Sequence, residues 1–265
     1  MYSKYQLAIK YIKYFLSSSN GKGHGTHSPF VFDFITKVLN DSRTFYCYES
    51  IEMLRNKMLH DNTTIPIKDF GAGSRLHLSK ERKVSAIAKS SLKPKKYSQL
   101  LFRMVDYYQP STVIELGTSL GITSSYLASG NSNAKIITME GSLEVAAIAK
   151  RNFEALQLNN ISVIEGNFDD TLPGLLSKIN TADFVFVDGN HRKEPTVNYF
   201  EQLLAHSTNN TILIFDDIHW SSEMEEAWDY IKQHTAVTLT IDLFFIGIVF
   251  LRSEQKEKQH FNIRF

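Results

Sequence analysis

Apolar and polar residues change their pattern near residue 112. From there on, five short β-branched runs alternate with stretches of helical periodicity. The runs cover 112–116, 135–139, 161–165, 184–187 and 211–215. The helical stretches cover 120–129, 142–156, 170–178, 194–206 and 222–233. Strands that alternate with helices predict a parallel, doubly wound α/β sheet with helices on its faces.

Two further apolar runs, 237–242 and 244–251, follow with only a turn between them. Because a short turn joins antiparallel strands, this hairpin predicts an antiparallel last strand at the edge of a seven-stranded sheet. The helix over 222–233 has Ser222 and Glu225 at the spacing of a capping box.

The residues before the first of these strands predict helices separated by glycine-rich joints. The first twenty residues form an amphipathic pattern with three lysines, which is typical of a helix packed on its own protein or on a membrane surface. Ser28 and Pro29 mark the start of a second helix, and helical patterning returns at 49–60 and 81–106. We therefore expect a mainly helical N-terminal region followed by an α/β domain, at 1–95 and 96–265.

Composition excludes several classes of protein. The chain has 265 residues, 43% of them apolar and 12% aromatic, which supports a large buried core and opposes disorder. Its one cysteine, Cys47, excludes a disulfide scaffold within the chain. No stretch approaches the ~20 apolar residues of a membrane span, and the first residues lack a signal-peptide pattern. We therefore expect a cytoplasmic protein.

The formal net charge of +1 conceals an uneven distribution. Residues 1–100 hold 17 Lys/Arg and 7 Asp/Glu, a net of +10, whereas residues 101–265 hold 12 and 21, a net of −9. Such a division is expected where the first part binds an anionic partner, or where the two parts attract each other. The second explanation is favoured, because no basic run with interleaved aromatic residues marks a nucleic-acid module.

Residues suited to a nucleotide-like ligand follow the first three strands, where ligands bind in open parallel sheets. In Glu115-Leu-Gly-Thr-Ser-Leu-Gly121, two glycines four apart allow a tight turn but do not match the G-x-G-x-x-G fingerprint. Glu140 could accept hydrogen bonds from a ribose diol, or be an ordinary surface glutamate. Phe168 and Asp169 could face an adenine ring, although Asp170 beside them could simply cap a helix.

Acidic residues follow the fourth and fifth strands, in Asp188-Gly-Asn-His191 and Asp216-Asp-Ile-His-Trp220. Adjacent strand ends bring Asp188 and Asp216 together, and carboxylates that close require a cation or a raised pKa. Oxygen ligands favour Mg²⁺, Mn²⁺ or Ca²⁺ over zinc. His191 has the chemistry of a general base. The alternatives are helix caps for the aspartates and a surface position for the histidine.

In combination, these motifs resemble the class I S-adenosylmethionine-dependent methyltransferases, and most of all the catechol and caffeoyl-CoA type O-methyltransferases. The resemblance covers about residues 95–250, and its most specific motifs lie between Val113 and Asp217. It implies a Rossmann-like sheet that ends in an antiparallel hairpin strand, and S-adenosylmethionine as the methyl donor. The cofactor residues that it implies are Glu115, Gly117, Thr118, Ser119, Gly121 and Thr123 for the methionine part, Glu140 and Gly141 for the ribose, Phe168 and Asp169 for the adenine, and Asp188.

The resemblance also implies a metal site and a base. Asp188, Asp216 and Asp217 fall on the family's three metal ligands, and His191 falls on its base. The family usually has asparagine at the third ligand and lysine at the base, so Asp217 and His191 are departures. The reaction implied is O-methylation of a small-molecule hydroxyl, assisted by Mg²⁺ or a similar cation. The basic N-terminal region, acting as a lid, hints at an anionic acceptor.

Other functions stay open at this point. An RNA methyltransferase acting on a modified nucleoside would use the basic region to hold phosphates, and a non-catalytic protein would bind S-adenosylmethionine without transferring its methyl group. A nicotinamide dehydrogenase is contradicted by the glycine spacing. The aromatic-rich N-terminal helices could also pair in a homodimer.

Two further segments look like ligand sites. Asp69-Phe-Gly-Ala-Gly-Ser74 resembles a glycine loop, but no strand–helix series with an acidic second strand end follows it. Gly23-His-Gly-Thr-His27 has two histidines and no cysteine nearby, which is insufficient for a zinc site. We expect a loop and a hinge, respectively.

Overall fold

The computed structural model describes residues 1–19, 21–23, 27–67 and 80–265. The segment Asp69–Ser74 and the middle of Gly23–His27 lie outside these residues. The chain forms two compact units, one of residues 41–175 and one of residues 1–40 together with 176–265. Neither division falls at residue 95, and the expected division into a lid and a methyltransferase domain stays a prediction.

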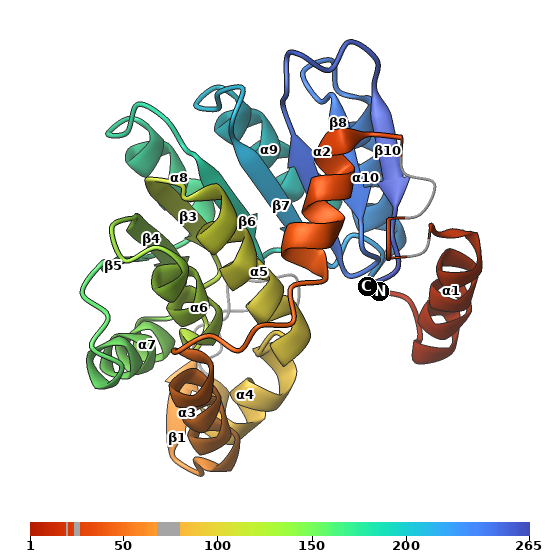
Figure 1. Cartoon of the computed structure of the whole chain (residues 1–265). Helices are drawn as coiled ribbons and strands as arrows, with labels where there is room; N and C mark the ends of the chain where they lie inside the picture. Colours follow the sequence, from red (N-terminus) through yellow and green to blue (C-terminus); the bar gives the residue numbers. More distant parts are fainter. Residues whose placement is uncertain (20, 24–26, 68–79) are drawn as a thin grey trace. The chain divides into compact units, whose positions relative to one another are not determined.

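The unit of residues 41–175 contains three parallel strands with helices between them (Figure 1). In space the strands follow the order β3 (Thr112–Leu116), β4 (Lys135–Glu140) and β5 (Ile161–Glu165). The helices are α6 (Ile122–Gly130), α7 (Leu143–Ala155) and, after β5, α8 (Phe168–Leu176). The predicted alternation of strand and helix is confirmed here. Because β3 and β4 are buried, their β-branched side chains supply the core.

Three helices and a short hairpin precede β3 in this unit. The helices are α3 (Tyr48–His60), α4 (Val84–Ser91) and α5 (Lys95–Tyr108), and the hairpin strands are β1 (Thr64–Ile67) and β2 (Lys80–Lys83). The helical pattern expected over 81–106 is thus divided, because Pro94 lacks a backbone N–H and disfavours helical geometry before it. Aromatic contacts of Tyr48 with Phe102 and Tyr126 join α3 to α5 and α6.

Five strands are described in the other unit, and they run in mixed directions. Their order is β10 (Gln259–Asn262), β8 (Leu239–Asp242), β9 (Ile246–Phe250), β7 (Ile212–Asp216) and β6 (Phe184–Val187). The hairpin strand β9 runs antiparallel to both β7 and β8. The predicted antiparallel hairpin strand is thus confirmed, but it lies inside the sheet, and the expectation of an edge position is wrong. With β10, which pairs parallel to β8, the sheet strands described in the two units number eight, one more than expected.

Helices α9 (Lys193–Leu204) and α10 (Ser222–Gln233) connect the strands of this unit. The N-cap of α10 is Ser221, whose hydroxyl accepts a hydrogen bond of 3.2 Å from the Met224 N–H. The predicted cap at Ser222 is therefore wrong by one residue. The cap predicted at Ser28 is confirmed, since its hydroxyl accepts the N–H of Val31.

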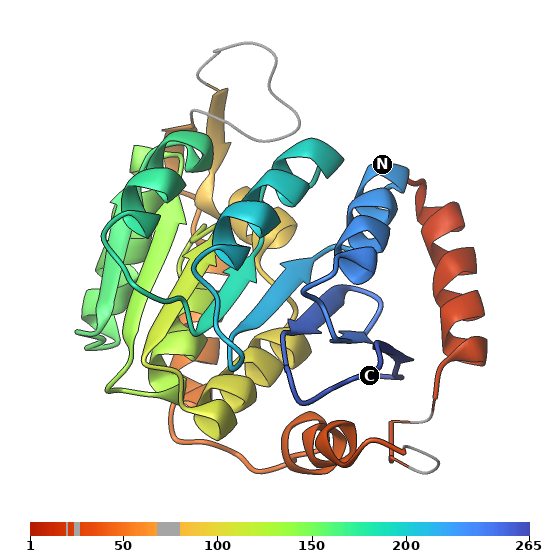
Figure 2. The same cartoon turned by 90° about the horizontal axis from the view of Figure 1, so that it is seen from above.

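The N-terminal segment belongs to the same unit as the C-terminal strands. It comprises α1 (Lys4–Ser17), α2 (Pro29–Phe34) and a short π-helix over Ile35–Leu39. Figure 2 shows α1, in red, beside α10, and the ammonium of Lys10 lies 2.9 Å from the carboxylate of Glu225. The Tyr14 hydroxyl donates to the backbone oxygens of Asp242 and Ile263. These contacts fasten α1 to residues that lie 228 and 249 positions after Tyr14 in the sequence.

A close approach between β9 and α10 gives a stability prediction. A Cβ placed on Gly247 would lie 2.6 Å from the ring of Trp228, which is fully buried. We expect Gly247→Ala to lower the free energy of unfolding by about 1–3 kcal/mol, because the ring has no space into which to move.

Gly174→Ala supplies the matched control for urea denaturation, since a Cβ there meets no atom within 4 Å. Because Gly174 lies inside α8, alanine should leave stability unchanged or raise it by up to about 1 kcal/mol. If both variants unfolded at the urea concentration of the unmodified protein, the close packing at Gly247 would be refuted.

Candidate functional site

The turn between β3 and α6 has an unusual backbone. Gly117, Ser119 and Gly121 have positive φ angles of 114°, 46° and 80°. A Cβ on Gly121 would also lie 2.5 Å from the ring of Phe153, so both its conformation and its surroundings require glycine. Among the residues that the structure describes, no side chain caps the first turn of α6. The free N–H groups of such a helix start favour polar or anionic ligand groups.

Glu115 lies beneath this turn and is fully buried. Its Oε2 accepts hydrogen bonds from the hydroxyls of Ser124 and Thr138, whereas its Oε1 has no hydrogen-bond partner among the described residues. Burial raises the pKa of Glu115 to about 7; the Ser124 and Thr138 hydroxyls act in the opposite direction, and the charge of Glu140 adds to the rise. The Thr118 hydroxyl lies 2.6 Å from that of Thr138, so Thr118 extends this buried network.

Glu140 ends β4 next to the glycine turn. Its Oε2 accepts the backbone N–H of Ser119 at 2.8 Å, and its Oε1 accepts that of Ser142 at 3.0 Å. These two bonds hold the carboxylate in one orientation. Through this carboxylate, the two bonds also join the turn after β3 to the start of α7.

The structure places the remaining predicted cofactor residues around the same three strand ends. Thr123 lies buried in the first turn of α6, and Gly141 directly follows β4. Phe168 is half-buried and Asp169 exposed, both in the first turn of α8. All the predicted cofactor residues except Asp188 thus belong to the unit of residues 41–175.

Asp188, His191 and Asp216 form a cluster in the other unit. Each offers one atom able to bind a metal ion, and these three atoms all lie within 4.8 Å of one another. His191 Nε2 lies 3.6 Å from Asp188 Oδ1. Because β6 and β7 pair in parallel, Asp188 after β6 and Asp216 at the end of β7 come together as adjacent strand ends predict.

Asp217 lies elsewhere. Its backbone is left-handed, with φ 53°, and its N–H donates to the Phe245 oxygen at 2.6 Å. Its side chain faces a small pocket, and it is not a member of the cluster found among the described residues. The third member of that cluster is the imidazole of His191. The expected site had oxygen ligands alone. A site with two carboxylates and one imidazole is better suited to Mn²⁺ or Fe²⁺ than that set.

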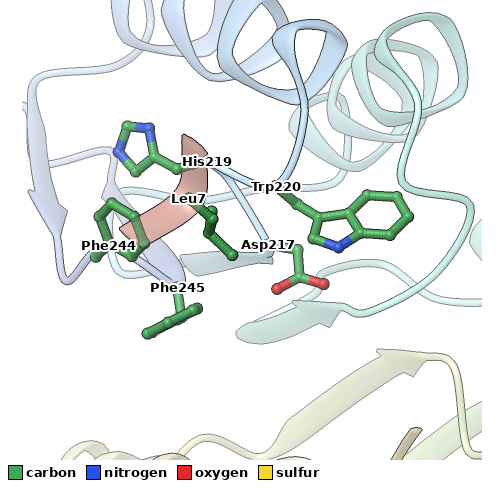
Figure 3. Close-up of a pocket in the computed structure, with 6 residues that line it drawn as sticks. All are labelled: Leu7, Asp217, His219, Trp220, Phe244 and Phe245. Carbon is green, nitrogen blue, oxygen red and sulfur yellow. The ribbon is translucent and has the colours of Figure 1, made fainter. Parts of the chain in front are cut away.

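The pocket beside Asp217 is mainly aromatic. Figure 3 shows Leu7 and Asp217 between Trp220 on one side and Phe244 on the other. The complete lining is Leu7, Asp217, His219, Trp220, Phe244 and Phe245. The ring of Trp220 also contacts that of His191, with centroids 5.8 Å apart, so the pocket adjoins the acidic cluster.

The sequence patterns do not predict this pocket. Trp220 follows the end of β7, and an aromatic side chain at such a position is the one available signal. No signal in the sequence marks Leu7 as part of the pocket, because it lies on α1, far from Trp220 in the sequence.

A partly buried ionic network contains His219, one of the residues that line the pocket. The imidazole of His219 lies 2.8 Å from Asp242 and 3.1 Å from Glu225, which also binds Lys10 and the Tyr2 hydroxyl. Burial acts to lower the pKa of His219, but the two carboxylates outweigh it and the pKa is raised. The network fixes α1, and with it Leu7, at the pocket.

The comparisons with known proteins agree with this geometry. Residues 114–218 match the methyltransferase-domain family model. This match confirms the resemblance found in the sequence, over the segment that contains the glycine turn and the acidic cluster. The O-methyltransferase imqG of Aspergillus flavus is 30% identical over 125 residues, or 45% of this chain and 49% of the relative. The chain therefore spans about half the length of the curated relative it matches.

Two solved O-methyltransferase structures share the fold. TomG from Streptomyces achromogenes, in complex with SAM, is 18% identical with a TM-score of 0.54, covering 62% of this chain and 82% of its own. The Bacillus cereus enzyme, in complex with SAH, is 21% identical with a TM-score of 0.55, covering 83% and 97%. At identities this low the structural likeness shows the fold alone, and that fold is the Rossmann-like α/β fold that was predicted.

Proposed function

We propose that the chain is an S-adenosylmethionine-dependent O-methyltransferase that acts on a hydroxyl of a small molecule. The observation that carries this proposal is the turn after β3, where three positive φ angles and the bond from Ser119 to Glu140 form a preorganised binding place. That turn lies in the segment matched by the methyltransferase-domain model. The names of the related proteins support the same class of reaction.

The residues of the turn fit S-adenosylmethionine. Glu115 Oε1 is a buried oxygen with no hydrogen-bond partner among the described residues, which is costly unless a ligand or water satisfies it. Glu140 can accept ribose hydroxyls while two backbone amides orient it, since a carboxylate accepts about four hydrogen bonds. Phe168 offers a ring face to the adenine, and Asp169 offers an acceptor. When bound, S-adenosylmethionine supplies a methyl group on a positively charged sulfur.

His191 is the proposed base that takes the proton of the acceptor hydroxyl. Asp188 lies 3.6 Å from its Nε2, so a nearby carboxylate stabilises the imidazolium that forms. Asp188 and Asp216 are the proposed cation ligands, and Asp217 is retained as a third candidate. A divalent cation held there would supply positive charge that stabilises the acceptor oxygen as an anion.

The pocket beside the cluster is small and suits one group of the acceptor rather than the whole molecule. Trp220, Phe244 and Leu7 give it apolar walls suited to an uncharged group. The carboxylate of Asp217 opposes the binding of an anion at this place, which weakens the case for the anionic acceptor that the N-terminal charge suggested.

Calorimetric titration with S-adenosylmethionine, in Mg²⁺ and in EDTA, tests the proposal directly. Micromolar binding supports it, and absence of binding under every condition contradicts it. A screen of catechols, sugars and RNA as methyl acceptors then separates the alternatives. Binding without methylation of any acceptor would favour the non-catalytic protein, and salt-sensitive RNA binding would favour the RNA enzyme.

We expect Glu140→Gln to weaken S-adenosylmethionine binding about tenfold or more, because hydrogen bonds to a charged group contribute about 1.5–3 kcal/mol. Glu154→Gln, on the exposed face of α7, is the matched control and should bind as the unmodified protein does. Equal affinity of the two variants for S-adenosylmethionine would show that Glu140 does not bind the cofactor.

A further inference from the structure

Helix α1 carries apolar side chains on two opposite faces. On one face, Tyr14 bonds to the backbone of Asp242, and the Tyr11 ring lies 5.0 Å from that of Phe244. The opposite face is solvent-exposed. We call it the outer stripe: Tyr5, Ile9, Ile12 and Leu16, which are 76%, 36%, 56% and 73% exposed.

The spacing of the outer stripe makes it a continuous surface. Its members are four, three and four residues apart, so they lie in one row on a helix of about 3.6 residues per turn. A helix on a protein surface normally places polar residues on its solvent face. A row of large apolar side chains there indicates a surface that is covered when the protein binds a partner.

The charge of α1 indicates what kind of partner. Lys4 and Lys13 are exposed, and neither forms an ion pair with a described residue. Lys10 differs, because it pairs with Glu225 on the packed face. The sequence of α1 contains no Asp or Glu. The exposed side of the helix is therefore apolar and positively charged, which is complementary to a surface that combines hydrocarbon with anionic groups.

We propose that α1 binds the surface of an anionic lipid bilayer through the outer stripe. Lying along the surface, the helix places its apolar row at the boundary of the acyl chains, while Lys4 and Lys13 reach the phosphate groups. No helix among the described residues is long and apolar enough to cross a bilayer. Because the 14 residues of α1 make a helix of about 21 Å, shorter than the ~30 Å hydrocarbon core, the proposed binding is peripheral.

A second copy of the chain fits this face less well. A helix of 14 residues is about 21 Å long and about 10 Å wide, so one face offers about 200 Å². A stable protein interface needs about 800 Å² per partner. Pairing two copies of α1 would also bring lysines together without an acidic residue on either helix.

Co-sedimentation of the whole chain with lipid vesicles tests the proposal. We expect binding to vesicles of phosphatidylcholine with phosphatidylserine, and about tenfold weaker binding to phosphatidylcholine alone. The variant Ile12→Glu/Leu16→Glu should reduce binding to the mixed vesicles about tenfold or more. The control Met53→Glu/Tyr107→Glu changes two exposed apolar side chains on α3 and α5, and should bind normally.

A second variant, Lys4→Gln/Lys13→Gln, keeps the outer stripe and should lose only the preference for phosphatidylserine. Circular dichroism and S-adenosylmethionine affinity establish that each variant is folded, and neither readout depends on lipid. Failure to sediment with any vesicle overturns the proposal, as does full binding by the Ile12→Glu/Leu16→Glu variant. The proposal is also overturned if the unmodified protein binds no vesicles but self-associates, and if the Ile12→Glu/Leu16→Glu variant abolishes that self-association. The outer stripe would then bind a second copy of the chain.

Discussion

Asp216→Asn is expected to lower kcat of methyl transfer about 10²–10³-fold and to abolish divalent cation binding. Asparagine keeps the shape of the side chain but removes the charge that Asp216 adds to the cluster with Asp188 and His191. The loss is of the size measured where one preorganised electrostatic contact to a reacting oxygen is removed. S-adenosylmethionine affinity should change by less than about threefold, since Asp216 is not among the predicted cofactor residues.

The measurements are methyl transfer to an acceptor found in the screen, and calorimetry with Mg²⁺ and with Mn²⁺. Asp229→Asn, an exposed aspartate on α10, is the control and should retain activity. Cation binding that persists in Asp216→Asn would exclude the cluster as the cation site.

His191→Gln distinguishes a base from a metal ligand at this position. If His191 takes the hydroxyl proton, activity should recover at high pH, where the acceptor ionises without help, and cation affinity should be unchanged. If it binds the cation through Nε2, cation affinity should fall and activity should stay low at every pH. The 3.6 Å separation from Asp188 Oδ1 is compatible with either role.

The stability of the protein should fall as the pH rises from about 4.5 to about 7, and Glu115→Gln should remove this component. Burial raises the pKa of Glu115 to about 7 from its ordinary value of 4.5. Between these values the folded chain keeps a proton that the unfolded chain has lost. The favourable contribution is therefore complete below pH 4.5 and lost above pH 7, a difference of about 3 kcal/mol.

Urea denaturation at a series of pH values measures this component as the difference between the unmodified protein and Glu115→Gln. The exposed Glu49 of α3 supplies the control, since Glu49→Gln also removes one carboxylate. If the free energy of unfolding changed with pH in the same way for the unmodified protein and Glu115→Gln, Glu115 would have the same pKa in the folded and unfolded chains. In that case the unpaired Oε1 would require a bound water or cation.

The sequence predicted those features that depend on regular periodicity. Strands over 112–116 and 211–215 alternate so regularly with helices that the parallel sheet and its strand ends could be placed within one or two residues. The closeness of Asp188 and Asp216 follows from that topology alone. A ligand site at adjacent strand ends can thus be predicted from the sequence of strands and helices alone.

Other features depend on contacts between residues that are distant in the chain. β10 is a short run with polar residues, and only its pairing with β8 makes it a strand. Whether β9 lies at the edge or inside the sheet depends on which strands it pairs with, and no local pattern encodes that choice. The left-handed conformation of Asp217 turns its side chain toward the aromatic pocket, and residue spacing gives no warning of it.

The fastening of α1 to Asp242 and Ile263 has a consequence for biosynthesis. Tyr14 lies 228 and 249 residues before these two partners, so α1 is translated long before the residues that bury its inner face. The continuous unit of residues 41–175 can fold while the remainder is still being translated, whereas the first forty residues must wait. During that interval both apolar faces of α1 are open to solvent, and the nascent chain then offers a hydrophobic, lysine-bearing segment of the kind that chaperones bind. Slow translation between α1 and these late partners should therefore favour aggregation of the nascent chain.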